Sequence, residues 1–349
     1  MRWMKCWATV ARRDRLGRAA HLLSLRVHLL LLISFLASPA GDAASQEATL
    51  HSQSNVVVIP ALVRNAKGEA VYGLTAKDFI VEDDGVEQPV RLDEAAEGSQ
   101  ISLVIAIQTG RRANYEFPRI LGLSAMLDPM IDAGLCRVAI VEFDSQIRLL
   151  QDFSGNSEKT SNNLKALPAG DGGASILAAV GYSVKLLEDA PKQQQRVLLL
   201  ISETRDHGSA GVKVENIVSA IGQSNTAVYA LAFSPTRSNM LDTMEGTNIG
   251  EMHEGVDFLA LGYQAVQAMR KNTPKTVASM SGGEYELFTT RNGFENRMID
   301  FSNHLRSRYV LSIEPKNPHE GLHRLQVRLR EPKEREVLAR SRYWAVGNK

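Results

Sequence analysis

Largely apolar runs recur through the middle of the chain, and each is followed by a polar loop. They cover Leu103–Ile107, Val138–Phe143, Val197–Ile201 and Ala227–Phe233. A strand with one solvated face would alternate apolar and polar positions, whereas these runs are apolar at nearly every position. They therefore predict strands that are buried on both faces of a parallel sheet.

Helical patterns separate these strands, because apolar residues recur there every three or four positions. The helical segments are Phe117–Met130, Ile176–Leu187, Val214–Ile221, Phe258–Met269 and Gly293–Leu305, and a short strand is expected at Tyr285–Phe288. Strands that alternate with helices form parallel sheets in α/β proteins. The pattern predicts an α/β domain over residues 98–308, with a doubly wound, mostly parallel sheet and helices on both faces.

The two ends of the chain have a different pattern. Residues 55–97 carry short strand-like runs, and the turn Asp84-Gly85 between two of them is a hairpin signal. Residues 309–345 return to strand character in Tyr309–Ile313, Leu322–Leu329 and Val337–Arg340. We therefore expect the two end segments to pair with each other into a small β module.

Residues 1–44 have the features of a secretory signal. A basic segment precedes the apolar run Leu29–Ala37, and small residues follow it, which predicts cleavage near residues 40–44. The run is shorter than the ~20 apolar residues that span a bilayer. An uncleaved anchor is the alternative, and membrane contact is expected only in that case. Residues 45–54 are polar and are interpreted as a linker, so the expected location is periplasmic or extracellular.

The formal charge of the whole chain, +1, hides an uneven distribution. Seven Arg or Lys against two Asp give residues 1–44 a net charge of +5, which leaves −4 for the rest. A mildly acidic body gives no reason to expect the basic face that nucleic-acid binding usually needs, so no nucleic-acid partner is expected. After the signal the only cysteine is Cys136, which lies in an apolar run and is expected to be a small buried side chain.

Short motifs occur along the chain in a specific order. They are Val63–Phe79, Glu82–Gln88, Ser102–Arg112, Gly170–Ser175, Leu198–Ser202, Ser281–Gly283 and Tyr309–Leu311. In order and spacing they resemble the von Willebrand factor A (VWA) family, and within it a bacterial exported, VWFA-related group of acidobacterial type. The resemblance covers nearly the whole chain after the signal. It implies a doubly wound α/β domain that serves as a protein-interaction module.

The resemblance also implies a metal-ion-dependent adhesion site, in which Mg²⁺ is held by Asp-x-Ser-x-Ser, a Thr and an Asp from three loops. Aligned with that motif, this chain has Gln108, Gly110 and Arg112 in the first loop. The second loop has Ala174 in place of the Thr, and the third has Glu203 in place of the Asp. Mg²⁺ prefers oxygen ligands, and an arginine repels a cation. We therefore expect a degenerate site with no metal and no cofactor; residual Mg²⁺ binding is the alternative.

The same loops are the candidate site for partner binding. The set comprises Gln108, Thr109, Gly110, Arg111, Arg112, Ser175, Glu203 and Asp206. Two interpretations of this face remain open: a decayed site on a scaffold that binds its partner elsewhere, or a metal-independent recognition surface. In the second, Arg111 and Arg112 pair directly with partner carboxylates, which the planar arginine fork suits, and the acid-rich segment 234–255 flanks them. The predicted function is an exported, non-enzymatic and metal-independent module that binds a protein or cell-envelope component.

Two alternatives remain open, and no catalytic residue is assigned. A hydrolase of the 203–210 loop would use Ser175 or Ser202 with Asp206 and His207, but adjacent Asp and His seldom reach the geometry of a triad. A metal-dependent adhesin with a non-standard site is the other alternative. The histidines are expected to be solvated; they are His207, His304, His319 and His323.

Overall fold

The computed structural model describes most of the chain from Val56 onward. The described residues are 56–93, 100–111, 113–191, 193–209, 211–233, 258–316 and 319–345, without the side chains of 258–264. The predicted signal and linker (1–54), Arg112 and the acid-rich segment 234–255 lie outside them. Among the described residues, no helix is both long enough and apolar enough to cross a membrane.

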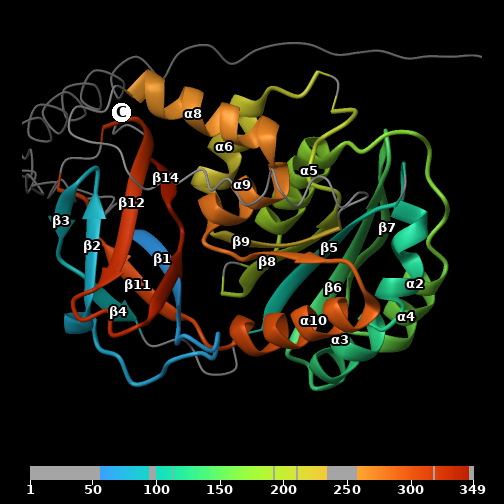
Figure 1. The fold of residues 1–349 in the computed structure, drawn as a ribbon, viewed down its shortest axis with the longest axis horizontal. Coiled ribbons are helices and arrows are strands. Elements are labelled where there is room, and N and C mark those ends of the chain that lie inside the picture. The colour runs from blue at the N-terminus through green and yellow to red at the C-terminus, as the bar shows by residue number, and fades with distance from the viewer. Residues whose placement is uncertain are drawn as a thin grey trace, which may run out of the picture. The chain divides into compact units, whose positions relative to one another are not determined.

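A six-stranded sheet forms the centre of the α/β part (Figure 1). Its strands are β5 Ile101–Gln108, β6 Cys136–Phe143, β7 Ile147–Ser154, β8 Gln195–Ser202, β9 Thr226–Phe233 and β10 Tyr285–Phe288, in the spatial order β10-β9-β8-β5-β6-β7. All neighbours pair in parallel except β7, which runs antiparallel to β6 at the edge. The predicted doubly wound, mostly parallel sheet is confirmed.

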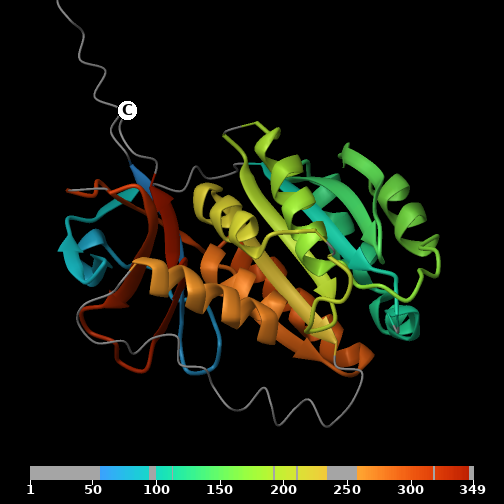
Figure 2. The same ribbon diagram turned by 90° about the horizontal axis from the view of Figure 1, so that it is seen from above.

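Helices cover both faces of this sheet (Figures 1 and 2). One face carries α2 Phe117–Ile120, α3 Leu123–Asp132, α4 Ser157–Lys165 and α10 Arg291–Leu305, and the other carries α5 Ile176–Glu188, α6 Val214–Gln223, α8 Phe258–Lys271 and α9 Thr273–Ser281. Strand β5 is buried along its whole length. Leu103 and Ile105 belong to the core under α3 and α10, whereas Val104 and Ala106 pack in the core under α5.

The two ends of the chain meet in a pair of antiparallel sheets beside the α/β part. Their strands are β1 Val57–Arg64, β2 Phe79–Asp83, β3 Val86–Gln88, β4 Arg91–Asp93, β11 Tyr309–Ile313, β12 Gly321–Leu329, β13 Glu336–Ala339 and β14 Arg342–Ala345. The sheets have the orders β13-β1-β11-β4 and β14-β12-β2-β3. They share one apolar core, to which Ile59, Phe79, Leu311, Leu325 and Tyr343 contribute. The expected β module is therefore a two-sheet sandwich.

The structure differs from the predicted elements in one predicted helix, in strand β7 and in helices α4 and α9. The predicted helix 117–130 is two helices, since α2 ends at Ile120 and α3 begins at Leu123. Strand β7 and helix α4 are absent from the prediction, because both present many polar positions. Helix α4 begins instead at a polar cap: the Asn156 side chain accepts a hydrogen bond from the Lys159 N–H at 2.7 Å.

Candidate functional site

The polar loops that follow β5, β6 and β8 meet at the carboxyl edge of the six-stranded sheet. Strands β6 and β8 lie on opposite sides of β5, so the strand order reverses there, and open α/β sheets bind ligands at such a reversal. The loop before α5 joins them, because Ala174 pairs with His207 in an isolated antiparallel bridge. We name residues 108–111, 144–146, 170–175 and 203–209 the top loops.

Gln108 and Glu203, at the ends of β5 and β8, hold each other in a buried pair. The Glu203 backbone N–H donates to Gln108 Oε1 at 2.9 Å, and Gln108 Nε2 donates to Glu203 Oε1 at 3.2 Å. Gln108 Nε2 also donates to the Gly110 carbonyl at 3.2 Å. Gln108 is 1% exposed and Glu203 is 5% exposed. The oxygen and the nitrogen of the Gln108 amide are therefore both used in hydrogen bonds within the top loops.

Arg111 supplies the positive charge that the buried Glu203 carboxylate needs. Its Nε lies 2.8 Å from Glu203 Oε1, and its side chain is 37% exposed, whereas that of Glu203 is 6% exposed. A buried charge is costly unless it is paired. The Arg111 backbone has a φ of 58°, a left-handed conformation that costs a non-glycine residue roughly 1–2 kcal/mol. Its N–H donates to the Asp171 carbonyl at 2.6 Å, which anchors the loop in that conformation.

Gly110 allows the top loops to pack backbone against backbone. A Cβ at this position would lie 2.0 Å from the Gly173 carbonyl oxygen and 2.9 Å from Asp144 Cα. Both are backbone atoms, which cannot swing aside as a flexible side chain can. The motif of the family that the chain resembles has a serine at this position. In this chain, the glycine allows the neighbouring loops to pack in direct contact there.

Three further candidates form hydrogen bonds inside the protein. The Ser175 hydroxyl donates to the Ser145 carbonyl at 3.2 Å, and the Thr109 hydroxyl donates to a backbone carbonyl of β6 at 3.3 Å. Asp206 Oδ1 accepts from the Leu177 N–H at 2.9 Å. Leu177 lies in the first turn of α5, so Asp206 caps that helix from a neighbouring loop. These polar groups stabilise the arrangement of the top loops.

The contacts do not fit the Mg²⁺ site that the family resemblance implies. Mg²⁺ needs near-octahedral oxygen ligands at about 2.0–2.1 Å. The Gln108 oxygen already accepts the Glu203 N–H, and the Ser175 hydroxyl donates to a backbone carbonyl. Glu203 Oε1 is taken by Arg111 and Gln108. A cation would have to compete with a tethered guanidinium for its principal carboxylate.

The structure thus brings three of the predicted site residues into direct contact, namely Gln108, Arg111 and Glu203. The others that it describes lie on the same or adjoining loops: Thr109, Gly110, Ser175 and Asp206. Among the described candidates, Arg111 is the most exposed. Arg111 is therefore the described candidate that solvent reaches most easily, and the buried members fix its position.

A second ion pair beside the top loops is absent from the predicted site. Arg148 forms a bidentate pair with Asp144, with Nη2–Oδ2 at 2.8 Å and Nη1–Oδ1 at 3.2 Å. Arg148 also pairs with Glu142, which faces it across β6 and β7. The Arg148 guanidinium lowers the pKa of Asp144. This ion pair could not be predicted from the sequence, because its members come together only when β7 pairs with β6.

Two histidines that were expected in solvent are buried, which corrects that prediction: His304 is 5% exposed and His323 is 1% exposed. His304 Nδ1 lies 2.9 Å from Glu284 Oε2, and its Nε2 lies 3.1 Å from the Gly68 carbonyl oxygen. Both partners are acceptors, so this arrangement favours the protonated ring, which donates from both nitrogens. The hydrogen bond to Glu284 raises the pKa of His304.

Comparisons with known proteins concern the fold. No protein-family model and no curated protein matches the chain. Among solved structures, BatB from Bacteroides thetaiotaomicron is 13% identical, covering 59% of this chain and 99% of that chain with a TM-score of 0.39. The vWF domain of the type V pili tip protein Mfa5 from Porphyromonas gingivalis is 9% identical, covering 58% and 95% with a TM-score of 0.39. An aerotolerance-related membrane protein from Bacteroides fragilis is 15% identical, covering 57% and 96% with a TM-score of 0.36.

Proposed function

We propose that the chain is an exported, non-enzymatic interaction module of the von Willebrand factor A type. In this proposal it binds an acidic surface of a protein or cell-envelope component without a metal ion. The observation that carries the proposal is the Arg111–Glu203 pair at the carboxyl edge of the sheet. The ordered sequence motifs and the signal-like N-terminus support the remaining parts of it.

Arg111 would act as a cation that is built into the chain. Its Nε is committed to Glu203, and the two Nη groups form the planar fork that matches a carboxylate in a bidentate pair. The left-handed backbone at Arg111 and the buried carboxylate beneath it hold the side chain in one place. A preorganised side chain loses less entropy on binding, which favours affinity.

The two alternatives would require the top loops to rearrange. A hydrolase would need a free serine hydroxyl, but the Ser202 hydroxyl donates to the Glu203 carbonyl at 2.9 Å and Ser202 is 0% exposed. A metal-dependent adhesin would need the Arg111–Glu203 pair to open so that Glu203 could bind the ion. The proposal therefore differs from the adhesin in one measurable property, the requirement for a divalent cation.

The test is capture of envelope proteins by the immobilised chain, in EDTA and in millimolar Mg²⁺. We expect the same protein to be captured in both conditions. The double variant Arg111→Gln/Glu203→Gln, which removes both charges together and leaves neither charge unpaired, should lose at least about tenfold in affinity. Arg91→Gln is the matched control, because Arg91 is 69% exposed on β4 and pairs with Glu314. Capture that requires Mg²⁺ would favour the adhesin, and capture that the double variant leaves intact would remove Arg111 from the site.

A further inference from the structure

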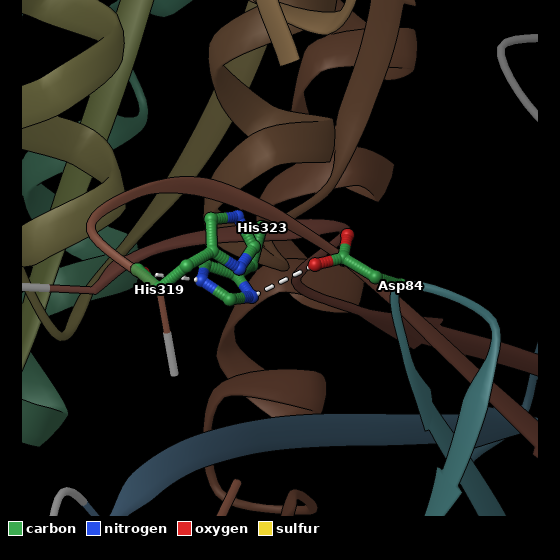
Figure 3. Close-up of side chains that lie close together, drawn as sticks. All are labelled: Asp84, His319 and His323. Atoms are coloured by element: carbon green, nitrogen blue, oxygen red, sulfur yellow. Dashed lines mark hydrogen bonds and ion pairs between the residues drawn. The ribbon is translucent and has the colours of Figure 1, made fainter. Parts of the chain in front are cut away.

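Histidines and aspartates converge in the β sandwich, at the turn between β2 and β3 (Figure 3). Asp84, His319 and His323 each offer a ligand atom, and these atoms all lie within 4.8 Å of one another. Asp83 is adjacent: its Oδ1 lies 3.2 Å from His323 Nδ1, while Asp84 Oδ2 lies 2.9 Å from the same nitrogen. The cluster joins the hairpin turn to the loop that leads into β12.

The surroundings of His323 determine which of its ring nitrogens can bind an ion. Nε2 lies 2.8 Å from the His319 carbonyl oxygen. A carbonyl only accepts hydrogen bonds, so Nε2 carries a proton and donates it. Nδ1 then faces two carboxylates, and a cation, either a proton or a metal ion, must lie between them. A histidine that binds a metal almost always donates its other N–H to a carbonyl or carboxylate, and His323 has this arrangement.

The ligand groups are held in place by the protein itself. The His323 ring lies between the rings of Tyr343, at a centroid distance of 4.6 Å, and His319, at 3.9 Å. The Tyr343 hydroxyl donates to Asp83 Oδ2 at 3.0 Å, and the Arg324 N–H donates to Asp84 Oδ1 at 2.9 Å. Each carboxylate therefore keeps one oxygen directed at His323, so an ion would find its ligands already oriented.

We propose that Asp84, His319 and His323 form a binding site for a divalent transition-metal ion of the zinc class, with Asp83 beside it. Two imidazoles and a carboxylate suit Zn²⁺, whereas Mg²⁺ and Ca²⁺ prefer oxygens alone. Zn²⁺ bonds of about 2.0–2.2 Å are compatible with ligand atoms at this spacing. The ion takes the place of the proton on His323 Nδ1 and links the hairpin turn to β12.

The site is structural and differs from that of a zinc peptidase. His319-Glu320-Gly321-Leu322-His323 has the spacing of the peptidase motif, which works by placing both histidines on one face of a helix. Here Gly321 has a φ of 132° and begins strand β12. The two imidazole rings lie 3.9 Å apart at a tilt of 32°, and the third ligand comes from the hairpin turn between β2 and β3.

The test is calorimetric titration of the metal-free chain with Zn²⁺ in buffers of different ionisation enthalpy. We expect one Zn²⁺ at this site, with proton release on binding. His319→Gln and Asp84→Asn should each weaken binding at least about tenfold. Asparagine tolerates the left-handed φ of 49° at Asp84, so that variant should fold. His207→Gln is the control, because His207 is exposed on a top loop.

Two results would overturn the proposal. One is the absence of Zn²⁺ binding to the wild-type chain. The other is an unchanged affinity in both His319→Gln and Asp84→Asn, which would place the metal on other residues. The Arg111→Gln/Glu203→Gln variant should bind Zn²⁺ as the wild type does, because its substitutions lie in the top loops. The zinc proposal and the interaction proposal can therefore fail independently.

Discussion

Arg111 Nε lies 2.8 Å from Glu203 Oε1, in the loops where the family resemblance implies a coordinated metal ion. The chain thereby places a fixed positive charge against the carboxylate that remains. An ion bound from solution can be removed by a chelator, whereas a guanidinium attached to the backbone cannot. Chelation therefore distinguishes the proposed metal-independent module from a metal-dependent adhesin in experiments that need no knowledge of the partner.

Divalent cations should not stabilise the chain through the top loops. We expect millimolar Mg²⁺ to leave the melting temperature unchanged, because Glu203 is already paired and the Gln108 oxygen is already bonded. Thermal-shift measurements check this. A stabilisation by Mg²⁺ that disappears in Glu203→Ala would contradict the prediction.

Gly110→Ala should destabilise the fold by about 1–3 kcal/mol, as overpacking of a filled space does. The added methyl group would meet the Gly173 carbonyl oxygen at 2.0 Å. Gly172→Ala is the matched control in the same set of loops, since a Cβ there has no heavy atom within 4 Å. Urea unfolding of both variants measures the difference. Equal stabilities for the two variants would show that the loops can separate without cost.

His304 should stabilise the fold more at low pH than at high pH. Its pKa is raised by the hydrogen bond to Glu284, so the protonated form is favoured in the folded chain. The contribution is complete below the unfolded value of about 6.5 and is lost as the pH rises through the folded pKa. The unfolding free energy of the wild type minus that of His304→Gln should therefore decrease with rising pH.

An NMR titration of the His304 ring gives the control for that prediction. Glu284→Gln removes the charge that holds the proton, so the pKa of His304 should decrease. Arg64 opposes Glu284 electrostatically at this site, so Arg64→Gln should move the pKa in the other direction. If neither substitution changes the pKa of His304, its shift has another cause.

Cys136 should be unreactive toward thiol reagents in the folded chain. It is 1% exposed, and burial raises its pKa to about 12. The thiolate is the reactive form, so labelling should proceed only as fast as the chain opens. With Cys6 replaced by serine, the labelling rate in rising urea should follow the unfolding transition. Rapid labelling without denaturant would show that β6 opens locally.

The parts of the fold that could be predicted from the sequence are those marked by a long run of apolar residues. Strand β5 is apolar on both faces, and this places Gln108 at the carboxyl edge without knowledge of any contact. Glu203 follows β8 for the same reason, so the meeting of the two could be anticipated. The direction of the Arg111 side chain could not, because it depends on a left-handed backbone and on the loop at Asp171.

The features that escaped prediction depend on contacts between distant segments. His304 meets the Gly68 carbonyl across 236 positions of sequence, and His323 meets Asp83 across 240. Their polar neighbours in sequence led to the prediction that these histidines are solvated. The fold instead buries both rings and places hydrogen-bond acceptors beside them. The spacing of His319 and His323 was the one local sign, and its usual helical context is missing because Gly321 begins a strand.

The sandwich also sets an order of events during folding. Strand β1 lies between β11 and β13, and Val57 is paired with Ile313. An emerging chain therefore carries β1 without either neighbour until residues 309–339 have been synthesised. The α/β part lies between the two halves, and its strands pair over shorter sequence separations than β1 and β11 do. Because contacts between distant segments form slowly, the α/β part should fold first and bring the two halves together, so its folding rate controls how long β1 stays exposed to aggregation.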